Sequence, residues 1–321
     1  MTKVSDMLYH LGGLPVMTGV PFSADAKYYF VDAANGSDGN DGLTPDAALA
    51  TVIAAEDKCV ANQHDTIFYI AGATALNMSA ALTWDKSYTH LIGICAPTMV
   101  AQRARLMYET GTTVASPLLD VTATGCIFKN IYLFHGIAAA TNLLNVRVTG
   151  GRNYFENVHF AGGGHATQAV DGGASLALYG AEECTFVNCT IGVDTIAAAT
   201  GMMGMRVDSA ATRNIFKGCN FTMYAGNSGS GFVEVVDSAG FDRYLMFEDC
   251  LFINDAVGYT MASAFVIPSG MGSATHRIIL KDSYGFGFTD WDASDRGLMY
   301  LSNSTITGGG TAGISQVSAA T

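Results

Sequence analysis

The residues with the most potential for chemistry in this chain are carboxylates that flank a tryptophan near the C-terminal end. Asp290, Trp291, Asp292 and Asp295 fall within six residues of one another. Glycoside hydrolysis needs two carboxylates roughly 5–9 Å apart, and an indole ring offers a face on which a sugar can stack. An Asp-rich turn that is simply solvated is the simpler interpretation, and the sequence favours it. We therefore treat this cluster as a fallback glycan site.

Two histidines form the second candidate. His159 and His165 lie with Asp171 in or beside a Gly-rich stretch. No Ser or Cys nucleophile sits at a strained turn beside them, so the sequence favours a surface histidine pair. Other acids are scattered, and the sequence predicts no catalytic residue, no cofactor and a chain that is not an enzyme.

A loop rich in Asp and Gly is the third candidate. Asp38, Asn40 and Asp41 resemble a calcium loop, but the EF-hand spacing with its final Glu is absent. A plain turn is favoured, the question of a bound cation in the Asp38–Asp41 loop stays open, and no metal site is predicted.

The elements that must position these residues are set by a six-residue phrase that recurs along the chain. Its copies are residues 128–133, 155–160, 186–191, 216–221, 247–252, 280–285 and 301–306. Their first residues are 27, 31, 30, 31, 33 and 21 apart. A period near thirty predicts stacked coils, since a β-propeller needs ~40–45 residues per blade and a leucine-rich repeat shows Leu at ~20–29. The predicted fold class is all-β, a parallel β-helix.

The phrase has a pattern that assigns its faces. Its first, fourth and sixth residues are mostly apolar, and its third is usually Asn or Asp. Because Asn, Asp and Gly tolerate left-handed backbone angles, we expect a bend at the third residue, with the first and fourth residues both inside. A second strand is expected before most phrases, at residues 144–148, 176–178, 205–207, 233–235 and 265–267.

Cysteine occupies the fourth position in three successive phrases, as Cys189, Cys219 and Cys250. That position repeats every ~4.8 Å along a β-helix, and buried free Cys behaves as a small hydrophobe. The total of seven cysteines is odd, which argues against a complete disulfide framework. The sequence predicts an internal ladder of free thiols.

The chain divides into four parts by pattern. Residues 1–26 form an apolar, Gly-broken arm, residues 27–72 an N-terminal module, 73–307 the β-helix and 308–321 a small, uncharged tail. In the module, residues 27–32 read as a strand. Thr44 and Pro45 predict the N-cap and first residue of a helix near 45–60, which would cap the open end of the stack. Residues 65–72 read as the first coil strand.

The arm is expected to anchor the chain to a partner protein, because alone it cannot bury enough area to offset its ordering entropy. The anchoring residues predicted from its apolar character are Met7, Leu8, Tyr9, Leu11, Leu14 and Val16.

Composition excludes some partners. The net charge is −12 with no Lys/Arg cluster, so no nucleic-acid ligand is expected. No run reaches the ~18 apolar residues of a membrane span, and no secretory signal opens the chain. We expect a soluble protein made in a cytoplasm, whose 49% hydrophobic content points to burial between subunits.

The module carries a family resemblance. Four segments follow one another over about 45 residues. They are a Tyr-Phe-Val-Asp strand, an Asn-Gly-Ser-Asp-Gly-Asn-Asp-Gly-Leu-Thr-Pro loop, an Ala-rich segment and an Asp-Thr-Ile strand. This order resembles the start of the pectate-lyase-like right-handed parallel β-helix superfamily, and is most similar to structural proteins of tailed bacteriophages. The superfamily includes lyases, hydrolases, tailspikes and non-enzymatic virion proteins, so the resemblance is specific for fold only.

The resemblance implies a function. The expected protein is a non-enzymatic head decoration or cement protein, a homotrimer on the virion that assembles in the host cytoplasm. Its arm would attach it to the major capsid protein or another virion protein. The alternatives left open are a tailspike-type polysaccharide depolymerase and a glycan-binding receptor protein.

Overall fold

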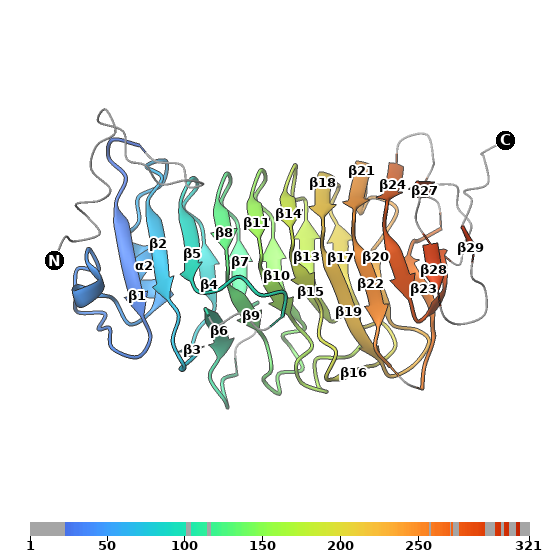
Figure 1. The fold of residues 1–321 in the computed structure, drawn as a ribbon, viewed down its shortest axis with the longest axis horizontal. Helices are drawn as coiled ribbons and strands as arrows, with labels where there is room; N and C mark the ends of the chain where they lie inside the picture. Colours follow the sequence, from blue (N-terminus) through green and yellow to red (C-terminus); the bar gives the residue numbers. More distant parts are fainter. Residues whose placement is uncertain are drawn as a thin grey trace.

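The computed structural model describes residues 23–100, 104–113, 117–256, 258–269, 271, 276–292, 299–302, 305–307 and 313–314. The chain winds as a right-handed parallel β-helix in which successive coils add one strand to each of three sheets (Figure 1). The predicted fold class is confirmed. The six predicted anchoring residues of the arm lie outside the described residues, as do Asp295 and most of the tail.

Each coil runs through the sheets in a fixed order. Sheet 1 receives the strand that precedes the phrase and has eight strands. They are β4 (Leu82–Trp84), β7 (Leu119–Val121), β10 (Leu144–Val148), β13 (Ala174–Tyr179), β17 (Met203–Asp208), β20 (Gly231–Val235), β23 (Met261–Val266) and β26 (Phe288–Asp292).

Sheet 2 receives the first half of each phrase and has ten strands. They are β1 (Tyr28–Asp32), β2 (Thr66–Ile70), β5 (His90–Ile94), β8 (Ile127–Lys129), β11 (Tyr154–Glu156), β14 (Thr185–Val187), β18 (Ala211–Lys217), β21 (Phe241–Glu248), β24 (His276–Lys281) and β27 (Met299–Ser302).

Sheet 3 receives the second half of each phrase and has eleven strands, all parallel except for the antiparallel pair β28–β29. Ten of them form one continuous path, with β3 at one end: β3 (Leu76–Met78), β6 (Arg105–Tyr108), β9 (Tyr132–Phe134), β12 (His159–Ala161), β15 (Thr190–Ile191), β19 (Asn220–Ala225), β22 (Leu251–Asn254), β25 (Tyr284–Phe286), β28 (Thr305–Thr307) and β29 (Gly313–Ile314). The eleventh, β16 (Ala197–Ala198), lies off this path and pairs with β19.

The bend from sheet 2 to sheet 3 is made by the third residue of the phrase. In all six phrases whose bend is described, that residue has a left-handed φ between 50° and 60°. They are Asn130, Asn157, Asn188, Gly218, Asp249 and Asp282. The predicted bend is confirmed, and it turns the first, fourth and sixth positions inward together.

Inside the stack, aromatic rings form a continuous ladder. The rings of Phe128, Phe155, Phe186, Phe216 and Phe247 are all buried and nearly parallel, with successive centroids 4.9, 4.8, 4.5 and 5.0 Å apart. The three inner rings therefore stack on a phenylalanine in the coil on either side, and the two end rings meet Leu91 and Leu280.

The predicted thiol ladder is also confirmed. Cys189, Cys219 and Cys250 are free and almost fully buried. Each thiol donates to the carbonyl of the first phrase residue one coil earlier, at 3.5 Å in all three cases. Burial raises the pKa of Cys219 and Cys250 well above the usual value of 9.0, so these thiols stay neutral and unreactive.

The N-terminal helix differs from its prediction. Instead of one helix over 45–60, a 3₁₀ turn, η1 (Pro45–Ala47), precedes a short helix, α2 (Val52–Lys58). The chain is extended between them because Leu49 forms a bridge with Val31 of β1. Thr44 makes no side-chain cap, whereas the hydroxyl of Thr51 accepts the N–H of Ala54 and caps α2.

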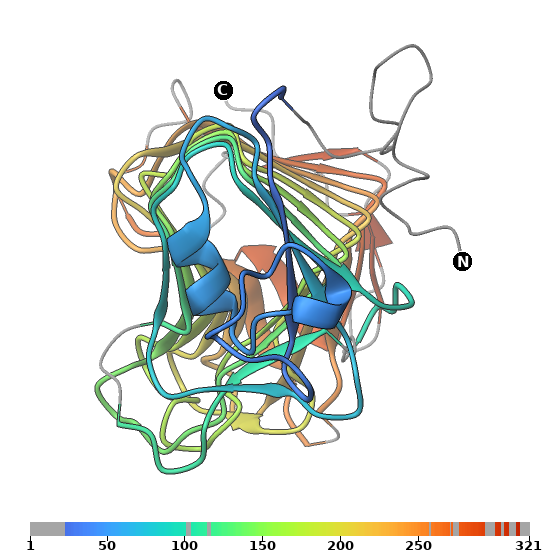
Figure 2. The same cartoon turned by 90° about the vertical axis from the view of Figure 1, so that its left-hand side faces the viewer.

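The helix α2 nevertheless lies over the N-terminal end of the stack, where it contacts β1, β2 and β4 (Figure 2). It buries Val52 and Ala55 there. Among the described residues, no helix has the length and apolar character to cross a membrane.

The aromatic ladder gives a stability prediction. Replacing the buried ring with Phe186→Ala should lower the free energy of unfolding by about 3–5 kcal/mol, because it leaves a cavity between two stacked rings. The matched control is Val187→Ala, which truncates the outward neighbour in the same strand and should cost much less. Urea unfolding of the variants measures both changes; equal losses would show that the ladder is not the principal packing element.

Candidate functional site

The fallback glycan site does not present its ring to solvent. Trp291 is only 2% exposed and packs edge-on against Phe252 and Phe288, with centroids 5.4 and 5.1 Å away. Asp290 is exposed and Asp292 is half-buried on either side of it in β26. The expectation that a sugar could stack on Trp291 is therefore wrong, because the strand turns the ring inward.

The histidine pair is not a surface pair. His159 is 3% exposed, and its Nε2 donates to the carbonyl of Gly192 at 2.9 Å. Burial lowers its pKa to about 4. His165 lies apart from it, in a turn where its Nδ1 accepts the N–H of Thr167, so the two rings do not act together.

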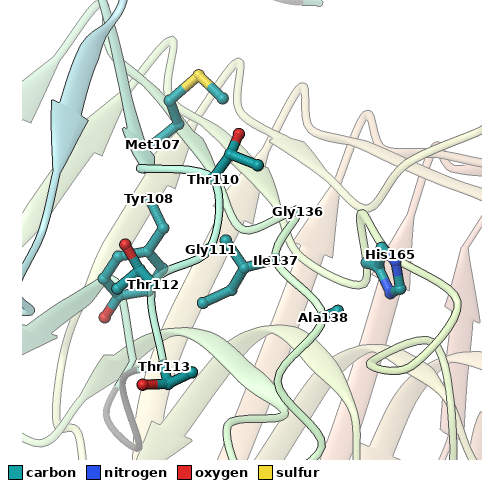
Figure 3. Close-up of a pocket in the computed structure, with 10 residues that line it drawn as sticks. All are labelled: Met107, Tyr108, Thr110, Gly111, Thr112, Thr113, Gly136, Ile137, Ala138 and His165. Atoms are coloured by element: carbon teal, nitrogen blue, oxygen red, sulfur yellow. The ribbon is translucent and has the colours of Figure 1, made fainter.

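His165 borders a cavity of about 310 Å³ between three loops that lead from sheet 3 to sheet 1 (Figure 3). Its wall includes Tyr108, Ile137 and the threonines Thr110 and Thr112. Among the described residues that line this cavity there is no carboxylate. They offer hydroxyl groups and one imidazole but no acid pair for glycosidic chemistry.

The Asp38–Asp41 loop uses its carboxylates to hold the chain. Asp38 accepts the N–H groups of Ala50 and Thr51 at 2.9 Å and the Thr51 hydroxyl at 3.0 Å. Asp41 accepts the N–H of Leu43. Across the described part of the chain, no group of three His, Cys, Asp or Glu side chains is placed to hold a metal ion.

Sheet 1 carries a row of charged residues that the sequence patterns did not single out. One position, flanked by inward apolar residues, points outward in every coil and stays in register from strand to strand. In register order it is occupied by Thr83, Asp120, Arg147, Ala177, Arg206, Glu234 and Val266. We call the five residues from Asp120 to Glu234 the sheet 1 row. At ~4.8 Å per strand, the row is about 19 Å long.

The first pair in the row is a two-point ion pair. Arg147 donates through Nε to Asp120 Oδ1 at 2.9 Å and through Nη2 to Oδ2 at 2.5 Å. The Arg147 pKa is raised chiefly by this hydrogen bond. Such a fork-to-carboxylate pair is rigid, and it holds both side chains in place.

The second pair is closer to an incomplete site. Arg206 and Glu234 are 14% and 20% exposed, and Arg206 Nη2 lies 3.0 Å from Glu234 Oε2. Apart from this ion pair, Glu234 Oε2 and Arg206 Nη1 are both buried without hydrogen-bond partners among the described residues. Buried groups of this kind normally find partners, and a bound ligand could supply them.

Glu234 has a raised pKa although it lies beside an arginine. Burial, the largest influence, raises its pKa; Arg206 opposes this, and the negative charge of Asp171 raises it further. Asp171 comes from the loop before β13 and is exposed. The region thus places a carboxyl with a raised pKa near an exposed second carboxyl group, Asp171.

Comparison with known proteins supports the fold. No family model matches the chain, and no curated protein matches its sequence. Among solved structures, a rhamnogalacturonan lyase is similar over 81% of this chain and 68% of its own, with 15% identity and a TM-score of 0.54. The pectate lyase Pel9A is similar over 84% and 64%, with 15% identity and 0.57. A pectin methylesterase solved with a hexasaccharide is similar over 92% and 93%, with 14% identity and 0.59.

These neighbours contradict the expectation that the chain is not an enzyme, because all three are named as enzymes with polysaccharide-related substrates. At this identity the likeness carries the β-helix fold, and the reaction must be argued from residues. The sequence patterns pointed to Asp290 and Asp292 in sheet 1 and to Asp171, but they did not bring Arg206 or Glu234 forward. The sheet 1 row lies in the strands that precede the phrases, and its members are about thirty residues apart.

The stability contributed by Glu234 and the stability contributed by Glu248 should change with pH in opposite directions. The pKa of Glu234 is raised above 4.5 by burial, so the stability it contributes is complete below pH 4.5 and falls as pH rises through its folded pKa. Hydrogen bonds from Lys281, the larger influence, and from Lys217 lower the pKa of Glu248. The stability that Glu248 contributes is therefore present above pH 4.5 and is lost as the pH falls through its folded pKa.

The test compares melting temperatures on both sides of pH 4.5. Relative to the unchanged protein, Glu234→Gln should gain stability as pH rises, whereas Glu248→Gln should lose it. A Glu234→Gln difference that stays flat or has the same sign as that of Glu248→Gln would contradict the assigned environments.

Proposed function

We propose that this chain is a polysaccharide-cleaving enzyme that binds an extended glycan along the sheet 1 row and hydrolyses a glycosidic bond at Glu234. The observation that carries this proposal is the row itself. It is linear, lies on the outside of the β-helix, and ends in a partly buried carboxyl with unused hydrogen-bonding capacity beside Arg206. The neighbours named for pectin and rhamnogalacturonan support the choice of an extended polysaccharide.

The residues have distinct roles in this reaction. Glu234, with its raised pKa, donates a proton to the glycosidic oxygen as the bond to the leaving sugar breaks. Asp171 is the second carboxylate. It takes a proton from the water that attacks the anomeric carbon on the opposite side of the sugar ring, so the bond to the water oxygen forms as the bond to the leaving sugar breaks. Arg206 holds Glu234 in position through its charge. Asp120 and Arg147, fixed by their two-point pair, bind sugar hydroxyls about three to four strands away.

The phage association belongs to the same proposal. The resemblance of the N-terminal module to tailed-phage structural proteins supports a tailspike-type depolymerase on a virion, with residues 1–26 as the attachment to another virion protein. Bacterial capsule and lipopolysaccharide therefore join pectin and rhamnogalacturonan as substrates to be tried.

The proposal is tested by incubating the purified chain with these polysaccharides and measuring new reducing ends. Glu234→Gln should lower kcat by roughly 10²–10⁴-fold, because an amide cannot donate the proton, and Asp171→Asn should cause a comparable loss. Glu248→Gln is the matched control, a Glu in a sheet 2 strand away from the row, and should keep full activity.

Three results would contradict the proposal. Activity that survives Glu234→Gln would remove the assigned acid. Unsaturated products would show elimination in place of hydrolysis. If no polysaccharide yields new reducing ends, the proposed hydrolysis at the sheet 1 row is wrong.

A further inference from the structure

The cavity shown in Figure 3 differs in composition from the sheet 1 row. Its floor is apolar, because Tyr108 and Ile137 are buried there, with 2% and 5% of their surfaces exposed. Its rim is polar, because Thr110 and Thr113 are exposed and Thr112 is half-buried. None of the described lining residues is Asp, Glu, Lys or Arg. The cavity therefore combines an apolar surface with hydroxyl groups and has no fixed charge from these residues.

The polar groups at the rim are left for a ligand. The hydroxyls of the three threonines are hydrogen-bonded to no described residue. His165 Nδ1 accepts the N–H of Thr167 at 3.1 Å, so the proton of the neutral ring lies on Nε2. That Nε2–H also has no partner among the described residues. In Figure 3, His165 lies across the cavity from Tyr108, so a bound molecule meets donors and acceptors from both sides.

The floor of the cavity is held in place by contacts between the three loops. The Tyr108 hydroxyl donates to the Pro117 carbonyl at 2.9 Å. The His135 ring packs edge-on against the Tyr108 ring, with centroids 5.1 Å apart, and the Gln168 amide is hydrogen-bonded to the His135 ring. The Gly164 N–H donates to the His135 carbonyl at 3.0 Å. The site is therefore formed before a ligand arrives, which lowers the ordering cost of binding.

The size and charge of the cavity limit the ligand. Its volume of about 310 Å³ is at the lower end of the ~300–1,000 Å³ of small-molecule sites, so it has room for a ring-sized molecule. An ion would give up water without a counter-charge from the described lining residues. A purely apolar molecule would leave the threonine hydroxyls and the imidazole N–H without partners. The ligand that fits is neutral, with an apolar face and several hydroxyl groups.

We infer that this cavity binds one neutral sugar unit of a glycan. The C–H face of a pyranose ring packs on Tyr108 and Ile137. The hydroxyls of the sugar exchange hydrogen bonds with the threonine hydroxyls and accept one from His165 Nε2–H. The described lining residues include no carboxylate, so the cavity binds the sugar without cleaving it.

The cavity lies where it can assist the sheet 1 row. The three loops that line it lead into β7, β10 and β13, which carry the first three members of the row. The loop that contributes His165 also contributes Asp171. A branch or a neighbouring glycan held in the cavity keeps the protein on the polysaccharide while another segment lies along the row. This role rests on the proposed function, whereas the binding itself does not depend on hydrolysis at Glu234.

An NMR titration of the full chain tests the inference, with methyl galactoside, methyl rhamnoside and methyl glucoside as probes and galacturonate as the charged comparison. The chain has seven histidines, so the ring signal of His165 is assigned by its loss in His165→Gln. That signal should shift saturably with at least one neutral glycoside, and galacturonate should bind more weakly. Thr112→Val should raise the dissociation constant roughly three- to tenfold through the lost hydrogen bond. Glu234→Gln should leave binding unchanged, so failure at the row and failure at the cavity are distinguished.

A blocking variant and a matched control complete the test. Ala138 is exposed and lines the cavity, so Ala138→Trp should fill it and abolish the shift. Ala140 is exposed in the same loop but is not a lining residue, so Ala140→Trp should keep the binding. Circular dichroism should show an unchanged fold for both. No saturable shift with any of the three glycosides, a shift that survives Ala138→Trp, or tighter binding of galacturonate would overturn the inference.

Discussion

The structure depends on one backbone constraint, the left-handed residue at the bend of each phrase. Asn130, Asn157 and their equivalents turn the chain at the same point in successive coils, so each coil lies in register on the one before. A shift of one residue would exchange the inner and outer faces of a strand. The ladders of Phe rings and thiols are the result of this register, and they make the bend and the core mutually dependent.

The same register also places carboxyl groups on the outer faces of the sheets, where the surroundings of each group set its pKa. On sheet 2, Glu248 lies between Lys217 and Lys281, and these two cations hold its pKa low. On sheet 1, Glu234 has one arginine, is largely buried and lies near Asp171, so its pKa rises. The two glutamates have similarly exposed side chains, 20% for Glu234 and 19% for Glu248. Their pKa values shift in opposite directions because Glu248 has two cations beside it, whereas the single Arg206 does not offset the burial of Glu234.

Periodic features of the fold could be predicted from the sequence. The bends, the inward positions and the Cys189, Cys219 and Cys250 ladder were all readable, because each repeats at a fixed place in the phrase. Features that depend on a single tertiary contact were not: Leu49 pairs with β1 and splits the expected helix, and the inward turn of Trp291 removes the expected sugar platform.

The candidate site was missed for a related reason. Arg147, Arg206 and Glu234 occupy the same position in the strands before their phrases, and a comparison of those strands alone would have aligned them. Their burial and the approach of Asp171 could not be read in this way, because they depend on how loops of different lengths fold back onto sheet 1.

The central claim is that a glycan lies along sheet 1 with Glu234 at the bond to be cleaved. A crystal structure of the inactive Glu234→Gln variant with a bound oligosaccharide tests it most directly. We expect a sugar chain that runs along the row from Asp120 to residue 234, with a glycosidic oxygen within hydrogen-bond distance of the substituted side chain. An oligosaccharide bound only at the cavity beside His165, or on sheet 3, would contradict it.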